Sequence, residues 1–252
     1  MRNFIFTAVL LWLSQPAALG AQTTPAPQIF FQPQALCDEV LRYRMISGKT
    51  VVGEMKVNLA HGESGEVIHV VESLSGLFER STALALRNDS TLQPLSSTTV
   101  FSNSNRFHTV RLNYGADVVA GQIHQPVEYG GLQEIQQELA GGSHDFFAVP
   151  YLLRAHALAP NQAFIFPIFD FRQKKVDRAR AWVAKKETVA APAGEFACYR
   201  VEGFSGELRW IFLLEEKFPH RLVKQIFPAL EIELELVEIT SGLENETVKA
   251  AR

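Results

Sequence analysis

The chain has 252 residues with a formal net charge of −3, and 47% of its residues are hydrophobic. This length is enough for one large domain with a sizeable core. The slightly acidic balance argues against a nucleic-acid partner, because domains that bind nucleic acids usually carry a clear excess of Lys and Arg.

The first 21 residues have the pattern of a secretory signal peptide. A basic lead ends at Asn3, residues 4–13 are apolar, and small residues occupy 17–21, where a signal peptidase cuts. The apolar segment is too short for a membrane span, so we expect no transmembrane span after cleavage and a periplasmic or secreted location in the bacterial envelope. Residues 22–35 are rich in Pro, Thr and Gln and are expected to form a flexible leader.

Short strands with alternating side chains follow, and we assign residues 36–240 to a single β-rich domain. Successive side chains of a strand point to opposite faces, and polar or Gly-containing turns separate the strands at the spacing of a meander. Gly130-Gly131 and Gly141-Gly142 bracket a Gln- and Glu-rich segment and indicate flexible connections. The strands predicted in this part are Cys37–Ile46, Glu54–Leu59, Glu66–Glu72, Thr82–Leu86, Ser97–Phe101, Phe107–Tyr114 and Val118–Ile123.

One segment breaks the two-residue period and predicts a single helix. Ser143 is a suitable N-cap, Asp145 suits the positive end of a helix, and apolar residues recur on one helical stripe as far as His156. Pro150 argues against a long regular helix and fits a helix that begins close to it. We expect this short helix to pack against the sheet.

The last third of the domain returns to strands, at Asn161–Phe171, at Ala179–Val189 and three times between Phe196 and Glu238. In the strand that begins at Leu208, apolar residues occupy both faces, which predicts a central strand. In the last strand, Glu231, Glu233 and Glu235 alternate with apolar residues, which predicts one wet face and one buried face. Residues 241–252 form a carboxyl-terminal tail.

These patterns together predict the fold class. It is mainly β, an antiparallel curved sheet of about ten strands in the form of a half-barrel or open barrel, with one short helix packed against it.

Three stretches carry a resemblance to a known family. They are the run D-F-F-A-V-P-Y-L-L-R at 145–154, the turn P-A-G-E-F at 192–196, and Trp210 followed by Glu215, Pro219 and a basic, apolar strand. They resemble an uncharacterised family of exported bacterial proteins, the domain of unknown function 3108 family (DUF3108), over roughly residues 37–237. The chain departs from the family pattern at Ala148, where a polar residue is expected, and at Pro150. The resemblance implies a curved antiparallel sheet in the bacterial envelope and supplies no catalytic residues.

Aromatic residues provide the main candidates for a ligand site. A strongly curved sheet lined by aromatic rings, with a helix across one mouth, could enclose an apolar cavity for an acyl chain. Alternatively, the same rings fill an ordinary close-packed core. The candidates are Phe164, Phe166, Phe169, Trp182, Trp210 and Phe212.

A basic run is the sharpest charge feature of the chain. It is either a solvated hairpin tip, as most charge runs are, or a patch that binds an anionic envelope polymer or lipid headgroups. Asp177 is the one acidic residue within it. The basic residues are Arg172, Lys174, Lys175, Arg178 and Arg180.

Cys37 and Cys198 are the only cysteines. In an oxidising compartment they could form a disulfide that ties the first strand to a late one, or they could be two unbonded buried residues. The seven histidines lack the spacing of a zinc site, and no nucleotide-binding Gly motif occurs, so we expect no metal and no cofactor. The stretch 203–206, G-F-S-G, lacks one residue of a nucleophile elbow and reads as a hairpin loop.

Three functions stay open at this point, with a catalytic role less favoured than a non-catalytic one. The first is an exported envelope protein that binds a lipid or other amphiphile in the concave face of the sheet, which requires a cavity. The second is an interaction or scaffolding module with a solid core, which docks an envelope protein through a sheet edge or exposed apolar patch. The third is an envelope hydrolase, which requires buried titratable groups that converge in a cleft.

Overall fold

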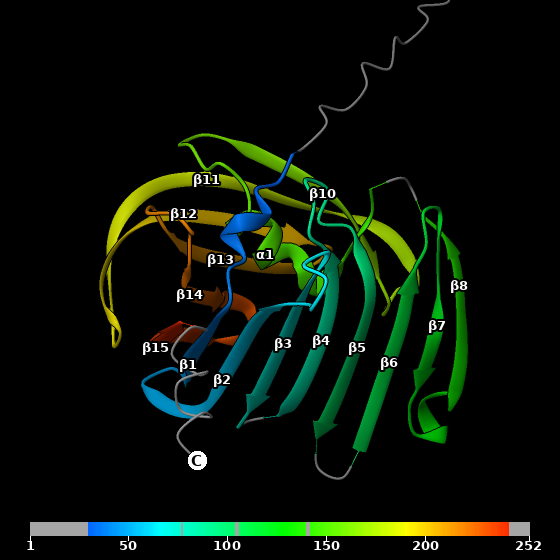
Figure 1. Ribbon diagram of the computed structural model, residues 1–252. Helices are drawn as coiled ribbons and strands as arrows, with labels where there is room; N and C mark the ends of the chain where they lie inside the picture. Colours follow the sequence, from blue (N-terminus) through cyan, green and yellow to red (C-terminus); the bar gives the residue numbers. More distant parts are fainter. Residues whose placement is uncertain (1–29, 77, 104–105, 140–141, 242–252) are drawn as a thin grey trace, which may run out of the picture.

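The computed structural model describes residues 30–76, 78–103, 106–139 and 142–241. Within these ranges, fifteen strands form one continuous sheet that does not close into a barrel. The sheet has two arms, each a meander of neighbouring strands (Figure 1). The predicted signal peptide and most of the carboxyl-terminal tail lie outside the described residues.

The first arm follows the chain order strand by strand, and all its pairs are antiparallel. Its strands are β1 (Glu39–Ser47), β2 (Thr50–His61), β3 (Val67–Ser75), β4 (Glu79–Arg87), β5 (Pro94–Asn103), β6 (Arg106–Tyr114), β7 (Val118–His124) and β8 (Leu132–Glu138).

The second arm is also a meander, and its last strand pairs with the first strand of the other arm. The sheet therefore ends at β8 on one side and at β9 on the other. The strands are β9 (His144–Asp145), β10 (Ala163–Asp170), β11 (Lys175–Ala191), β12 (Gly194–Ser205), β13 (Leu208–Glu215), β14 (Leu222–Phe227) and β15 (Ile232–Ser241), and the β9–β10 pair is parallel.

The helical elements are short. The α-helix α1 (Val149–Arg154) directly follows the 3-10 turn η3 (Phe146–Ala148), and further 3-10 turns are η1 (Pro33–Ala35), η2 (Val127–Tyr129) and η4 (Pro228–Leu230). Asp145 caps η3 by accepting a hydrogen bond from the backbone N–H of Phe147, and Pro150 lies in the first turn of α1. The helix thus begins next to Pro150, as predicted, and later than an N-cap at Ser143 would allow.

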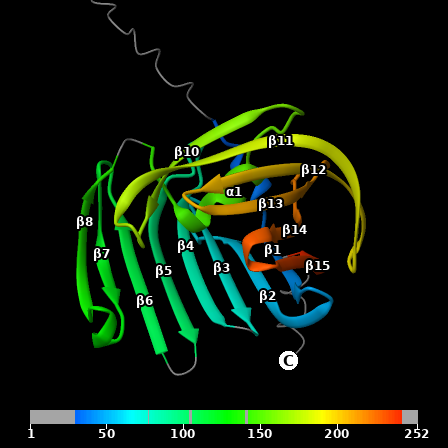
Figure 2. The ribbon, with the colours of Figure 1, turned by 180° about the vertical axis from the view of Figure 1, so that it is seen from behind.

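The second arm curls over the first, and α1 lies between them (Figures 1 and 2). The main hydrophobic core fills this space with side chains from both arms and from the helix. A smaller cluster joins β6, β7 and β8 to Phe169 of β10, and a third lies around Val189, Cys198, Leu213 and Val223. Burial of apolar surface between the arms is therefore what keeps the sheet curved.

The predicted fold class is confirmed: the protein is mainly β, with a curved, almost entirely antiparallel sheet and one short α-helix. The strand that begins at Leu208 is central, between β12 and β14, as predicted. The prediction of about ten strands was too low. The segment 132–138, expected to be a flexible connection, forms the edge strand β8, whose single well-buried residue, Ile135, is too weak a signal to recognise.

Two further expectations need correction. The glutamate face of β15 is not uniformly wet, because Glu235 is only 8% exposed and accepts hydrogen bonds from Arg44 and Lys224. The leader also joins the fold earlier than residue 36: Phe31 is buried in the main core, and its N–H donates to the carbonyl of Ser90.

Candidate functional site

The segment that contains η3 and α1 is held to the sheet by three buried polar side chains. The first is Asp145, whose Oδ2 accepts a hydrogen bond from Tyr114 Oη at 2.6 Å while its Oδ1 caps η3 at 2.8 Å from the Phe147 nitrogen. Burial raises the pKa of the Asp145 carboxyl, and the hydrogen bonds from Tyr114 and Ser97 oppose that shift. This residue fixes where the chain turns from β9 into the helical segment.

The second anchor is Tyr151, which donates from Oη to Glu72 Oε1 at 2.5 Å. The other carboxylate oxygen of Glu72 accepts from Arg80 Nη2, also at 2.5 Å, and the Arg80 guanidinium lies 4.9 Å from the centroid of the Phe147 ring. Burial and the adjacent carboxylate raise the pKa of Tyr151 well above its usual value, so it stays a neutral donor. The middle of α1 is thereby tied to β3 and β4.

The third anchor is Arg154, at the end of α1. Its Nη2 donates to Glu39 Oε1 at 2.6 Å and to the carbonyl of Ala35 at 2.9 Å, and its side chain is 1% exposed. Glu39 also accepts from Arg221 Nε at 2.8 Å. A buried charge is stable only when it is paired, so Glu39, Arg154 and Arg221 join the helix, β1 and the start of β14.

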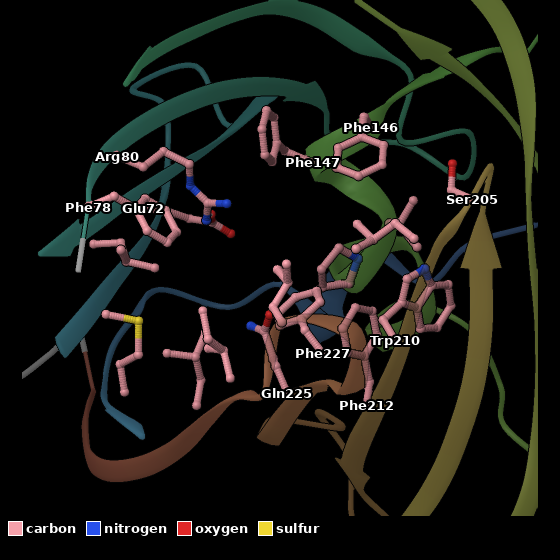
Figure 3. Close-up of a pocket in the computed structure, with 18 residues that line it drawn as sticks. Glu72, Phe78, Arg80, Phe146, Phe147, Ser205, Trp210, Phe212, Gln225 and Phe227 are labelled. Carbon is pink, nitrogen blue, oxygen red and sulfur yellow. The ribbon is translucent and has the colours of Figure 1, made fainter. Parts of the chain in front are cut away.

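A pocket opens beside this segment, between the two arms (Figure 3). The first arm contributes residues of β1, β3 and β4, the helical segment contributes residues of η3 and α1, and the second arm contributes residues of β12 to β15. The cavity volume is about 160 Å³. Its aromatic lining consists of Phe78, Phe146, Phe147, Trp210, Phe212 and Phe227.

Trp210 and Phe212 form one wall of the pocket. Their rings stack with centroids 4.4 Å apart and an interplanar angle of 13°. Gly203, opposite Trp210 on β12, makes this position possible, because a Cβ at residue 203 would lie 2.2 Å from the indole ring. The absence of a side chain at residue 203 therefore gives the Trp210 ring the space to lie against the backbone of β12.

Polar groups in the lining are few. Glu72 is the one carboxylate among the lining residues, and it is already bound by Tyr151 and Arg80. Gln225 and Ser205 are 6% and 2% exposed, and the Ser205 hydroxyl has no hydrogen-bond partner among the described residues. No histidine lines the pocket. The lining thus suits an apolar ligand and offers no nucleophile paired with a base.

The structure separates the six aromatic candidates predicted from the sequence. Trp210 and Phe212 line the pocket. Phe164 and Phe166 stack on each other at 6.0 Å within the main core, and Phe169 belongs to the cluster with β6 to β8. Trp182 is 39% exposed and packs beside Phe204. A ligand-binding role for any of them stays a prediction.

Sequence reasoning missed Phe78, Phe146, Phe147 and Phe227 as lining residues. Phe146 and Phe147 stand in the run that resembles the family, directly before the helix, where the helical period would have assigned one ring to each side. Their position in the pocket depends on the 3-10 turn η3, which alternation and helical periodicity do not predict. Phe78 lies just before β4 and Phe227 ends β14, so no strand pattern assigned them a face.

The basic run forms the tip of the β10–β11 hairpin and the first residues of β11. All five basic residues are exposed. Arg172 donates to both carboxylate oxygens of Asp170, and the Arg180 guanidinium lies 5.8 Å from the centroid of Phe204. Lys174 Nζ donates to the side-chain carbonyl of Gln133 on β8. The hairpin tip therefore touches the first arm and is not a wholly free loop.

The cysteines are both free, so the disulfide considered from the sequence is absent. Cys198 lies in the small cluster with Val189, Leu213 and Val223, whereas Cys37 stands before β1 near Glu39 and Arg154. Burial raises the pKa of the Cys198 thiol to about 12, and that of Cys37 is raised for the same reason. Both thiols are consequently weak nucleophiles.

Two features are absent from the described residues. No three His, Cys, Asp or Glu side chains within them are arranged to hold a metal ion. None of their helices has the length and apolar character needed to cross a membrane.

The chain is similar to one protein family and to solved structures. The family described as protein of unknown function (DUF3108) matches residues 42–222. A beta-barrel-like protein of domain of unknown function DUF1849 from Brucella abortus has a similar crystal structure, with a TM-score of 0.56, 10% identity, and coverage of 82% of this chain and 98% of that chain. A protein with a YmcC-like fold from Bacteroides fragilis matches with a TM-score of 0.28 and 11% identity over 85% and 100% of the two chains. No curated protein matches the sequence.

Proposed function

The chain belongs to the DUF3108 family, whose description assigns no function, and we propose from its pocket that it is a non-catalytic protein that binds an amphiphile. The apolar part of that ligand would occupy the space between the two arms. The amino-terminal signal pattern supports a role in the bacterial envelope, either in the periplasm or outside the cell.

The observation that carries the proposal is the composition of the pocket wall. Six aromatic side chains and several aliphatic ones converge from both arms on one cavity, although close-packing is the rule for a protein interior. Apolar walls with few polar groups are typical of small-molecule sites. A cavity of about 160 Å³ has room for a short alkyl segment or one small ring, so it would enclose only part of a longer chain.

The polar anchors beneath the pocket support the same proposal. Asp145, Tyr151 and Arg154 hold the helical segment to the sheet from its far side, so the rings of Phe146 and Phe147 have a rigid support. A preorganised wall reduces the conformational entropy lost on binding.

A second candidate function rests on a different region. Strand β8 is the open edge of the sheet, and nearby Phe107, Val127 and Leu132 are 62%, 88% and 61% exposed. Open edges and exposed apolar side chains are features of docking surfaces. A protein-interaction role in the envelope would use this end of the molecule and would not need the pocket.

Native mass spectrometry of the protein purified from a bacterial periplasm tests the proposal. We expect a co-purifying amphiphile, or uptake of added dodecyl chains, in the unaltered protein. Leu230 lines the pocket and is 54% exposed, so Leu230→Trp should fill the pocket without disturbing the core and abolish uptake.

The matched control is Val51→Trp, which adds the same ring at a 57% exposed position on the β1–β2 hairpin outside the pocket. It should bind like the unaltered protein. A protein that carries nothing and takes up no added amphiphile would overturn the proposal and favour docking through β8.

A further inference from the structure

We propose that the amphiphile is anionic and that its headgroup binds in a groove between the tip of the β10–β11 hairpin and the ends of β6 to β8. This inference rests on the proposed function, because it assigns the second half of the same ligand. The groove adjoins the Phe146 and Phe147 rings that line the pocket, and it contains a lysine that forms no ion pair with a described carboxylate.

The groove is amphipathic. Its volume is about 440 Å³, and its apolar lining is formed by Phe101, Val110, Ile123 and Phe171. The polar lining consists of two cations, one imidazole and two amides, with no carboxylate among the lining residues. These polar residues are Arg172, Lys174, His108, Gln125 and Gln133.

Lys174 gives the groove its net charge. The Arg172 guanidinium is neutralised by Asp170, which it contacts at 2.9 Å and 2.8 Å. Lys174 instead donates to the amide oxygen of Gln133, and it forms no ion pair with any described carboxylate. An anionic group would therefore gain a charge-assisted hydrogen bond from a lysine that no acidic side chain already occupies.

The aromatic residues of η3 separate the groove from the pocket by the thickness of a ring. Phe146 lines the pocket, and the Arg172 guanidinium lies 4.7 Å from the centroid of its ring. Phe147 also lines the pocket, and its ring packs 6.4 Å from Phe101 and 6.1 Å from Phe171, which both line the groove. For one ligand to occupy both, its chain must pass the edges of the η3 rings, after which its headgroup lies beside Arg172.

The cation inside the pocket is a weaker candidate for the headgroup. Arg80 contacts Glu72 at 2.5 Å, and the Glu72 side chain is only 5% exposed, so the pair is internally neutral. Drawing Arg80 away would leave a buried carboxylate with one fewer partner, which is unfavourable. The groove therefore accounts for charge selectivity better than the pocket itself.

Calorimetric titration with two probes of equal chain length tests the inference. The anionic probe is dodecyl phosphate, and the neutral probe is 1-monododecanoylglycerol. We expect Lys174→Gln to weaken binding of dodecyl phosphate about tenfold, as the loss of one charge-assisted hydrogen bond predicts, and to leave the neutral probe unchanged. Lys175→Gln, an exposed neighbour outside the groove lining, should change neither affinity.

The outcomes separate this inference from the proposed function. Equal binding of both probes, with no effect of Lys174→Gln, would overturn the headgroup assignment and leave the proposed function intact. Failure of the unaltered protein to bind either probe would overturn both. Inorganic phosphate is the third arm: if it alone binds as tightly as dodecyl phosphate and depends on Lys174, the groove is a phosphate site and the assignment to an amphiphile is wrong.

Discussion

The segment 144–154 has two sides that behave in opposite ways. On the sheet side, Asp145, Tyr151 and Arg154 are almost fully buried and form hydrogen bonds of 2.5 to 2.6 Å with Tyr114, Glu72 and Glu39. On the pocket side, the same stretch presents rings and aliphatic groups to a cavity. The sheet side forms buried hydrogen bonds and an ion pair with the strands, and the pocket side leaves apolar surface unfilled.

The residues of the run that resembles the family therefore fall into two groups: some contact the sheet and others line the pocket. Its polar residues, which sequence inspection would single out first, connect the helix to the sheet. Its phenylalanines line the pocket. We therefore expect substitutions on the sheet side to lower stability and substitutions at the pocket to change binding while stability is nearly unaltered.

The largest expected effect is that of Arg154→Met. Removing this guanidinium leaves Glu39 with Arg221 as its sole charged partner among the described residues, in a site where the carboxylate is 2% exposed. Loss of one partner of a buried ion pair lowers the free energy of unfolding by about 3 kcal/mol or more. Urea denaturation measures this free energy. A decrease below about 1 kcal/mol would show that the ion pair between Arg154 and Glu39 does not hold the helix.

A pH-dependent effect of similar size should come from His144, at the start of the same segment. Burial lowers its pKa to about 4 from the ordinary 6.5, against a weaker opposing hydrogen bond to the backbone of Leu92. Below pH 6.5 the unfolded state binds a proton that the folded state does not, so the free energy of unfolding falls as the pH is lowered toward 4. The loss over this window is on the order of 3 kcal/mol.

His144→Gln should remove this part of the pH dependence. The raised pKa of the neighbouring Asp145 acts in the opposite direction, because the folded state then takes up its proton before the unfolded state does. Asp145 is present in both proteins, so the difference between their stability profiles from pH 7 to 4.5 isolates the histidine. Parallel profiles would contradict the prediction.

Tyr151→Phe should have a moderate effect. The change removes the hydrogen bond to Glu72, which keeps its contact with Arg80. We expect a loss of about 2 kcal/mol in the free energy of unfolding, the range for a hydrogen bond to a charged group. Thermal or urea unfolding at pH 7 checks it, and an unchanged midpoint would mean that Tyr151 anchors the helix by packing alone.

The smallest stability effect belongs to the pocket side. Leu230→Trp adds a ring at an exposed edge of the pocket and should change the free energy of unfolding by less than about 0.5 kcal/mol. Binding of a dodecyl chain should nevertheless be lost. If Leu230→Trp lowered the free energy of unfolding as well as binding, the proposed division between stabilising residues and pocket residues would be wrong.

The sequence was sufficient for the fold class because alternation is a local property. The central position of β13 followed from apolar residues on both of its faces, and the short helix near Pro150 followed from proline geometry. Strand β8 could not be recognised, since an edge strand with one well-buried side chain resembles a polar connection.

The candidate site was only partly accessible from the sequence. Trp210 and Phe212 were predicted to line a cavity, but so were Phe164 and Phe166, which lie in the packed core. An aromatic ring on the concave face either packs against a neighbouring ring or lines a cavity. Which of the two occurs depends on how the arms close over α1, and the sequence pattern does not show this. The neutralisation of Glu235 by Arg44 and Lys224 is a long-range contact of the same kind.

The central claim is that an alkyl chain occupies the pocket beside Trp210, and tryptophan quenching tests it most directly. Trp210 lines the pocket and Trp182 does not, while Trp12 lies in the predicted signal peptide. In the exported protein, Trp182→Phe leaves Trp210 as the reporter, and Trp210→Phe leaves Trp182 as the matched control. A dodecyl chain brominated near its end should quench the emission of Trp210 in a saturable manner and leave that of Trp182 unchanged. Equal quenching of both tryptophans, or none, would contradict the claim.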